Sequence, residues 1–341
     1  MFSKKRVIIS IGITILLGGI FFGYKAGRTI TVIGDDHEAI WAETISEFSK
    51  IPEREEARVD VLFIGIRGIN GDDKEPMNGE LLADTIILAS LNKDNGKAAL
   101  ISIPRDLYVE IPDYGEEKIN AAYAVGEARR PGGGGLQLMK ALVSVLSGVY
   151  VDYAVSVDFE GFQKIIGDIG EITIYRTSPF EEPKQWIHDG REDERYWKLE
   201  ESGWVFYVPE GKNLMNSEEA LYYARSRYSS SDFDRMRRQH EIIEAVKSKA
   251  LSLGVLVNPV KIFNILDTLG DNVRSDMDIS EMKELIDTIK DGEIEDWSKV
   301  FLEENENGGL LVSGNVDGKY VLLPKGGNYD EIRRMFKGVV E

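Results

Sequence analysis

The sequence of 341 residues has no cysteine and only three histidines, His37, His188 and His240, which stand far apart. The absence of cysteine excludes a disulfide framework and a thiol nucleophile, and it is compatible with an extracytoplasmic location. Three scattered histidines argue against a histidine-rich metal site and against a Ser-His-Asp triad. We therefore do not expect a thiol enzyme, a histidine-rich metalloprotein or a hydrolase with a Ser-His-Asp triad.

Positive charge is also scarce. Lys and Arg number 41 against 59 Asp and Glu, which gives a formal net charge of -18. A nucleic-acid binder needs a basic face to meet phosphates, so we expect no nucleic-acid partner. The length accommodates a short anchor and one large domain of about 280 residues.

A long apolar run stands at the N-terminus, where the 18 residues Val7–Tyr24 follow a short basic segment. This length is just enough to cross a bilayer, and no small-x-small cleavage site follows it. We expect residues 1–6 in the cytoplasm, an uncleaved signal anchor over 7–24, and the remainder outside the cell as a single-pass cell-membrane protein. We predict a linker with an amphipathic helix over 25–58 and one extracytoplasmic domain over 59–341.

The centre of the sequence predicts a β-hairpin. Two apolar strands, Thr85–Leu91 and Lys97–Ile103, flank an Asn-Gly turn signal, and their near-continuous apolar content is typical of strands covered on both faces. Antiparallel pairing would bring Asp84 beside Arg105 and Asp106, which makes the end of the hairpin a candidate site. An ordinary ion pair closing the hairpin is the alternative.

The rest of the chain alternates predicted strands and helices, which indicates an α/β domain with helices on both faces of a sheet. Further strands are predicted at 59–64, 153–157, 172–175 and 320–324, and helices at 136–146, 159–166, 280–290 and 329–336. Two segments stay open. Gly132–Gly135 before a helix could cradle phosphate or form a flexible turn. Pro179–Gly203 has no clear period and could be a lid, an acceptor-binding loop or a plain surface insertion.

Four arginines gather in two adjoining elements near residue 230. If the chain is extended after the predicted helix that Asn216 caps, Arg225 and Arg227 point to one side. In the next predicted helix, Arg235, Arg238 and Gln239 share a face near the N-terminal end, which favours anions. Arginine suits phosphate oxygens, so the cluster predicts an anion site, with surface ion pairing as the alternative.

These segments resemble the LytR–CpsA–Psr family of cell-wall glycopolymer ligases. The resemblance runs from about Val59 to Ser248, with a family-like tail to Val340. It rests on ordered motifs at Asp84–Leu88, Ser102–Asp106, Lys118–Tyr123, Val157–Phe162, Arg225–Arg227 and Asp232–Gln239. The resemblance implies an α/β/α domain with a central mixed sheet behind one transmembrane helix.

The resemblance also implies an activity: transfer of an anionic glycopolymer from a polyprenyl-pyrophosphate carrier to peptidoglycan, with a phosphodiester formed at the membrane surface. The lipid tail would lie in an apolar groove between sheet and helices. Asp84 would bind Mg²⁺ (or Mn²⁺) or position the nucleophile, and we expect Asp106 to be a supporting partner of Arg105. The pyrophosphate would be held by Arg105, Arg225, Arg227, Arg235 and Gln239, with Arg238 as a further candidate from the helical face.

The sequence departs from the family pattern at two places. Leu82-Ala83 stands where many members have Arg-Ser, and Arg67 occupies the region of an expected aspartate. Arg67, or Asp72 and Asp73, could compensate. The alternative functions are a lipid-pyrophosphate hydrolase and a non-catalytic, membrane-anchored lipid-glycan binding protein.

Overall fold

The computed structural model describes residues 31–32, 37–68, 79–186, 195–252, 272–277, 281, 284–285, 297–304 and 309–341. The expected anchor at 7–24 and the candidates Asp72 and Asp73 lie outside these residues, as does most of the helix predicted at 280–290. Within the described part of the chain, no helix is long and apolar enough to cross a membrane.

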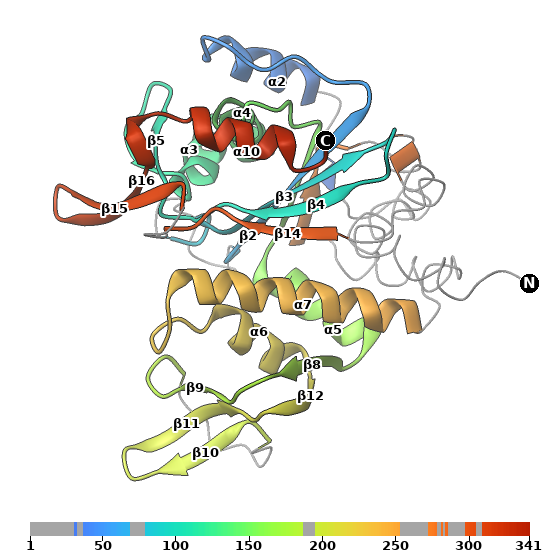
Figure 1. Cartoon of the computed structure of the whole chain (residues 1–341), viewed down its shortest axis with the longest axis vertical. Coiled ribbons are helices and arrows are strands. Elements are labelled where there is room, and N and C mark those ends of the chain that lie inside the picture. Colours follow the sequence, from blue (N-terminus) through green and yellow to red (C-terminus); the bar gives the residue numbers. More distant parts are fainter. Residues whose placement is uncertain are drawn as a thin grey trace, which may run out of the picture.

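A mixed seven-stranded sheet forms the centre of the fold, as expected (Figure 1). β2 runs parallel to β7 and antiparallel to β3, while β4 is antiparallel to β3 and parallel to β14. In spatial order the strands are β1 (Thr31–Val32), β13 (Val273–Ser275), β7 (Tyr153–Val157), β2 (Arg58–Ile66), β3 (Ala83–Asn92), β4 (Ala98–Ser102) and β14 (Trp297–Phe301).

The predicted central hairpin is β3 and β4, with Ile87 opposite Ser102 and Leu91 opposite Ala98. Its turn places only Gly96 at positive φ (69°). Successive side chains alternate between the two faces of the sheet and are buried on both, because helices cover each side. The hairpin is therefore internal to the sheet, as its continuous apolar content predicted.

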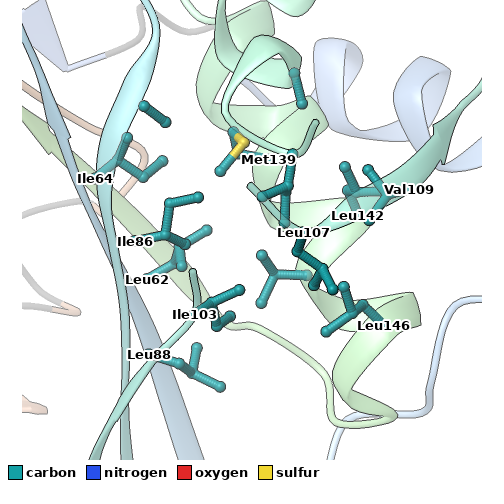
Figure 2. Close-up of a cluster of buried hydrophobic side chains, with 14 of the residues drawn as sticks. Leu62, Ile64, Ile86, Leu88, Ile103, Leu107, Val109, Met139, Leu142 and Leu146 are labelled. Atoms are coloured by element: carbon teal, nitrogen blue, oxygen red, sulfur yellow. The ribbon is translucent and has the colours of Figure 1, made fainter. Parts of the chain in front are cut away.

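Helices cover the two faces as separate layers (Figure 1). The layer with α3 and α4 closes a buried hydrophobic core, in which strand side chains meet α4 (Figure 2). Its helices are α2 (His37–Ser46), α3 (Ala121–Arg129), α4 (Gly134–Ser147) and α10 (Asp330–Gly338). On the opposite face lie α5 (Phe159–Ile169), α6 (Ser217–Arg225) and α7 (Asp232–Ser252).

The glycine run serves the contact between α3 and α4. A Cβ on Gly126 or Gly134 would come within 2.3 Å of the facing backbone, so both positions require glycine for close helix packing. The backbone N–H groups of Gly132 and Gly135 donate to the Glu127 carboxylate at 2.6 and 3.3 Å. The turn interpretation is confirmed, since residues 131–133 form a turn before α4. The phosphate cradle is not, because the donors of Gly132 and Gly135 bind an internal carboxylate.

Small peripheral sheets account for the remaining strands. Ile172–Tyr175 is a strand, but it pairs outside the central sheet, and the segment 179–203 contains two strands that its sequence did not predict. The pairs are β8 (Ile172–Arg176) with β12 (Gly211–Met215), β5 (Tyr108–Ile111) with β6 (Gly115–Lys118), and β15 (Leu311–Val316) with β16 (Lys319–Pro324). β9 (Phe180–Glu182), β10 (Trp197–Glu200) and β11 (Gly203–Val208) form a three-stranded sheet, and a short 3₁₀ helix spans Lys325–Gly327.

One buried polar contact fastens α7 to the central sheet. Ser102 Oγ on β4 lies 2.7 Å from His240 Nε2 on α7, and both residues are almost fully buried. Burial, with a smaller contribution from Lys299, lowers the pKa of His240 to about 4, while Glu244 acts in the opposite direction. His240 is therefore neutral in the folded protein at pH 7, and protonation opposes its burial.

The low pKa of His240 predicts acid-sensitive stability. In the unfolded chain His240 titrates near its ordinary pKa of about 6.5. Its contribution to the free energy of unfolding is present above pH 6.5 and is lost as pH falls toward 4, by about 2 kcal/mol at pH 4.5. Denaturant unfolding at pH 7 and 4.5 should show that His240→Gln loses less stability than the wild type. Equal losses would contradict this prediction.

Candidate active site

A cavity of about 580 Å³ lies between the central sheet and the layer of α5, α6 and α7. Most of its wall is apolar and comes from both the sheet and the helices. This wall includes Phe63, Ile87, Leu100, Val157, Phe162, Ile242 and Trp297. Trp297 and Lys299 come from β14, in the C-terminal region where the sequence indicated no chemistry. An apolar groove between sheet and helices was expected, and the cavity has this position.

The end of the hairpin contributes the first polar pair to this wall. Asp84 stands at the start of β3 and Arg105 follows β4, so antiparallel pairing brings them together as predicted. Arg105 Nη1 donates to Asp84 Oδ1 at 2.5 Å, and both residues line the cavity. Asp106 lies behind them, where Lys118 Nζ donates to it at 2.6 Å and Arg105 Nε is 3.7 Å away. Asp106 thus lies within ion-pair distance of Arg105, and its supporting role stays a prediction.

Asp232 connects this pair to α7. Its Oδ1 lies 2.8 Å from Arg235 Nη2 and 3.6 Å from Arg105 Nε. Arg235 Nη2 also donates to the backbone carbonyl of Asp84 at 3.2 Å. Burial raises the pKa of Asp232, while both arginines oppose that rise. Asp232 was not among the site residues predicted from the sequence, although its position three residues before Arg235 on a helix indicates that the two side chains can pair.

Arg225 and Arg227 enter the cavity from the end of α6. The predicted capping box of Asn216 and Glu219 starts this helix, and Ser226 is extended (φ -56°, ψ 132°), so both arginines reach the same wall. Arg225 lies 4.1 Å from the centroid of the Phe159 ring. Among the described residues, neither arginine has a carboxylate within ion-pair distance. These two guanidinium groups are therefore available to an anion.

Arg67 is a further cation on the same wall, and it is exposed. Together with burial, its charge lowers the pKa of Arg225. Leu82 also lines the cavity, so the position where an additional arginine was expected is apolar here. One departure from the family pattern, Leu82, thus removes an arginine from the cavity wall, and the other, Arg67, adds one.

The helical face predicted on α7 divides into two roles. Arg235 and Gln239 line the cavity, but Arg238 does not. Arg238 is buried, its guanidinium donates to the backbone carbonyls of Tyr223 and Ser226, and it lies 4.5 Å from the Phe180 ring centroid. Burial lowers the pKa of Arg238 to about 10. The prediction that Arg238 faces the anion site together with Arg235 and Gln239 is therefore wrong.

Carboxylates on the cavity wall near the arginines are few. Asp84 uses Oδ1 for Arg105, and its Oδ2 has no partner among the described residues. Asp158 accepts hydrogen bonds from the backbone N–H of Gly161 at 2.7 Å and from Asn272 at 2.9 Å. Within the described part of the chain, no group of three potential metal ligands occurs. Glu244 also lines the cavity and pairs with Lys299 through Oε1. Beside the arginines, Asp84 thus offers an uncommitted carboxylate oxygen, which suits an ion shared with a ligand.

Comparison with known proteins identifies the family. The LytR_cpsA_psr family matches residues 27–337, which is nearly the whole chain. The chain belongs to this family. The resemblance found in its motifs is thereby confirmed.

Relatives within the family carry transferase names. The chain is 28% identical over 284 residues to the polyisoprenyl-teichoic acid–peptidoglycan teichoic acid transferase TagU of Oceanobacillus iheyensis, covering 82% of this chain and 78% of that protein. It is 26% identical to the TagU of Bacillus licheniformis over 319 residues, 92% of this chain and 90% of that protein.

Solved structures of the family share the fold. A crystal structure of a Streptococcus agalactiae protein superposes with a TM-score of 0.62 at 22% identity, covering 83% of this chain and 88% of that one. TagT bound to LI-WTA gives a TM-score of 0.56 at 20% identity, covering 86% and 95% of the two chains.

The different roles of Arg238 and Arg227 predict different effects on stability. Arg238→Met leaves two buried carbonyls without donors, so we expect its free energy of unfolding to fall by about 2–4 kcal/mol. Arg227→Met removes no ion pair among the described residues and should stay within about 0.5 kcal/mol of the wild type. Denaturant unfolding measures both values. Equal destabilisation of the two variants would contradict the assignment.

Proposed function

We propose that this chain transfers an anionic glycopolymer from a polyprenyl-pyrophosphate carrier to peptidoglycan, at the outer face of the cell membrane, and forms a phosphodiester bond. The names of its relatives support transfer of a glycopolymer to peptidoglycan. One observation in the structure carries the finer proposal. Arg225 and Arg227, which have no carboxylate within ion-pair distance among the described residues, line the same cavity as a largely apolar wall. A ligand with an anionic head and a lipid tail matches that arrangement.

The cavity separates the two parts of such a donor. Its apolar wall would take the first isoprenoid units, because burying their surface is favourable by about 25 cal/mol per Å². The pyrophosphate would lie beside the polar residues of the wall. These are the guanidinium groups of Arg105, Arg225, Arg227 and Arg235 and the amide of Gln239. Planar guanidinium groups can donate two parallel hydrogen bonds to phosphate oxygens. The glycan would then extend out of the cavity toward peptidoglycan.

The reaction needs charge stabilisation more than covalent help. A muramic acid hydroxyl oxygen would attack the phosphorus that carries the glycan, forming a new P–O bond as the bond to the bridging oxygen breaks. Polyprenyl phosphate leaves with that oxygen, and the hydroxyl proton passes to solvent or, where no metal ion occupies the free oxygen of Asp84, to that carboxylate. Arg105 would stabilise the charge that builds up on the phosphate oxygens.

A magnesium or manganese ion is part of this proposal. Mg²⁺ binds through one or two carboxylates together with substrate phosphates and water, so the uncommitted oxygen of Asp84 fits such a site. Asp232 lies behind the arginines and is not on the cavity wall. When bound, the ion would neutralise negative charge on the phosphates.

Arg105 gives the sharpest test by mutation. We expect Arg105→Met to lower the transfer rate by about 10²–10³-fold, because one charge-stabilising donor is lost from the transition state. The assay gives the full-length protein a polyprenyl-pyrophosphate oligosaccharide, Mg²⁺ and peptidoglycan, and measures glycan covalently attached to the wall. Arg237→Met is the matched control, since Arg237 lies on the same helix but is half exposed and pairs with Asp234 and Glu303.

Three outcomes of this assay separate the candidate functions. Covalent transfer supports the proposal, and near wild-type transfer by Arg105→Met would end the role given to Arg105. Release of free phosphorylated sugar without transfer would identify a hydrolase. Tight binding without turnover would identify a lipid-glycan binding protein.

Metal dependence is tested separately. We expect EDTA to abolish transfer and added Mg²⁺ or Mn²⁺ to restore it. Asp84→Asn should raise the Mg²⁺ concentration needed for half-maximal rate by about tenfold, since a carboxylate ligand is lost. Transfer that persists in excess EDTA would contradict the metal proposal and leave the arginine site standing.

A further inference from the structure

The end of β9 and the residues that follow it pack along the chain that carries Arg225 and Arg227. We call Glu182–Trp186 the clamp segment and Arg225–Ser229 the arginine loop. Each of the five residues of the arginine loop accepts or donates a hydrogen bond to the clamp segment. The contacts are made by Glu182, Gln185 and Trp186.

Glu182 holds the second half of the arginine loop. Its Oε2 accepts from the backbone N–H of Tyr228 at 2.8 Å, from that of Ser229 at 3.0 Å and from the Ser229 hydroxyl at 3.3 Å. Glu182 has no exposed surface and does not line the cavity. Its Oε1 accepts from the backbone N–H of Lys184 at 3.3 Å, within the clamp segment itself. A fully buried carboxylate is costly unless it is hydrogen-bonded, so the three donors of the loop stabilise the burial of Oε2 when the loop has this conformation.

Gln185 and Trp186 hold the first half. Gln185 Nε2 donates to the carbonyl of Arg225 at 3.0 Å, and its Oε1 accepts from the N–H of Arg227 at 2.7 Å. The two bonds of one amide thus bracket Ser226. Trp186 Nε1 donates to Ser226 Oγ at 2.7 Å, and its ring lies 5.1 Å from the Arg225 guanidinium. Both arginines are thus held through backbone hydrogen bonds of the loop, without a carboxylate on either guanidinium among the described residues.

The charge of the loop explains why such support matters. Arg105 and Arg235 are held by Asp84 and Asp232, whereas Arg225 and Arg227 have no carboxylate partner among the described residues. Burial and the like charge of Arg67 lower the pKa of Arg225, while the charge of Asp84 acts in the opposite direction. Hydrogen bonds to the backbone hold the loop without neutralising the guanidinium groups. They therefore keep both charges available to a ligand.

We infer that the clamp segment positions Arg225 and Arg227 for an anionic phosphate ligand, with Glu182 as a positioning residue that does not touch the ligand. The clamp segment is part of Pro179–Gly203, for which the sequence left a lid, an acceptor-binding loop and a surface insertion open. The inference rests on the proposed function for the identity of the ligand, but its geometry stands on the hydrogen bonds alone.

The test replaces Glu182 by its isostere in the full-length chain. In Glu182→Gln, the amide can place an N–H group against the loop donors. We expect amide hydrogen exchange at Arg227–Ser229 to become about tenfold faster or more, with exchange in β3 and β4 unchanged. The dissociation constant for inorganic pyrophosphate should rise about tenfold. Glu181→Gln is the matched control, because Glu181 is half exposed on the neighbouring position of β9 and lies 3.7 Å from Lys198.

Ser229→Ala provides a second variant if Glu182→Gln does not fold. It removes one donor to Glu182 and should change the same two measurements in the same direction by a smaller factor. Loop exchange at the wild-type rate would overturn the inference, as would faster exchange with unchanged pyrophosphate binding, equally fast exchange throughout the protein, or a wild type that binds no pyrophosphate.

The inference and the proposed function fail in different ways. A wild type that binds pyrophosphate through a clamped loop but transfers no glycan would refute the function and leave the clamp. A Glu182→Gln protein that matches the wild type in exchange, pyrophosphate binding and transfer would refute the clamp and leave the function.

Discussion

Asp232 is the contact on which the arrangement of the site depends. Its carboxylate lies between Arg105, which follows the central hairpin, and Arg235, which is in the first turn of α7. Arg235 in turn reaches the backbone of Asp84, so the end of the sheet and the start of the helix are connected through charge-assisted contacts. Because these groups are largely buried, losing one partner would leave another uncompensated. The geometry of Arg105 is therefore fixed before any ligand arrives.

The two faces of the sheet explain why the site lies where it does. Toward α4 the strands contribute Ile86 and Leu88 to a closed core (Figure 2). Toward α7 the intervening positions Ile87 and Leu100 face a cavity instead. A sheet buried on both faces needs apolar residues at every position, so strand sequence alone does not reveal which face is filled. The two faces differ in their helical layers, since only the layer of α5, α6 and α7 encloses the described cavity with the sheet.

Local patterns accounted for much of the fold and site. The hairpin placed Asp84 beside Arg105 because antiparallel register follows from a short turn, and the capping box at Asn216 fixed the start of α6. Arg238 could not be separated from Arg235 in this way. Both occupy a helical face, and only the packing of Phe180 and the carbonyls of α6 decides that Arg238 is structural.

Long-range contacts were the part that the sequence did not predict. Glu182 is one acidic residue among 59, and its role depends on a loop 46 residues further along the chain. β14 joins the sheet beside β4 from nearly 200 residues away and brings Trp297 to the cavity. The run at Gly132–Gly135 had the composition of a phosphate loop, yet its donors meet Glu127. Composition indicated donors, and only tertiary structure showed what they bind.

The central claim is that one cavity holds both the lipid and the pyrophosphate of the donor. A crystal structure of the protein with bound polyprenyl pyrophosphate tests it most directly. We expect phosphate oxygens within hydrogen-bonding distance of Arg105, Arg225 and Arg227. The isoprenoid chain should pack against Phe63, Leu100 and Ile242. A lipid bound outside the space between the sheet and α7, or phosphates that do not contact these arginines, would contradict it.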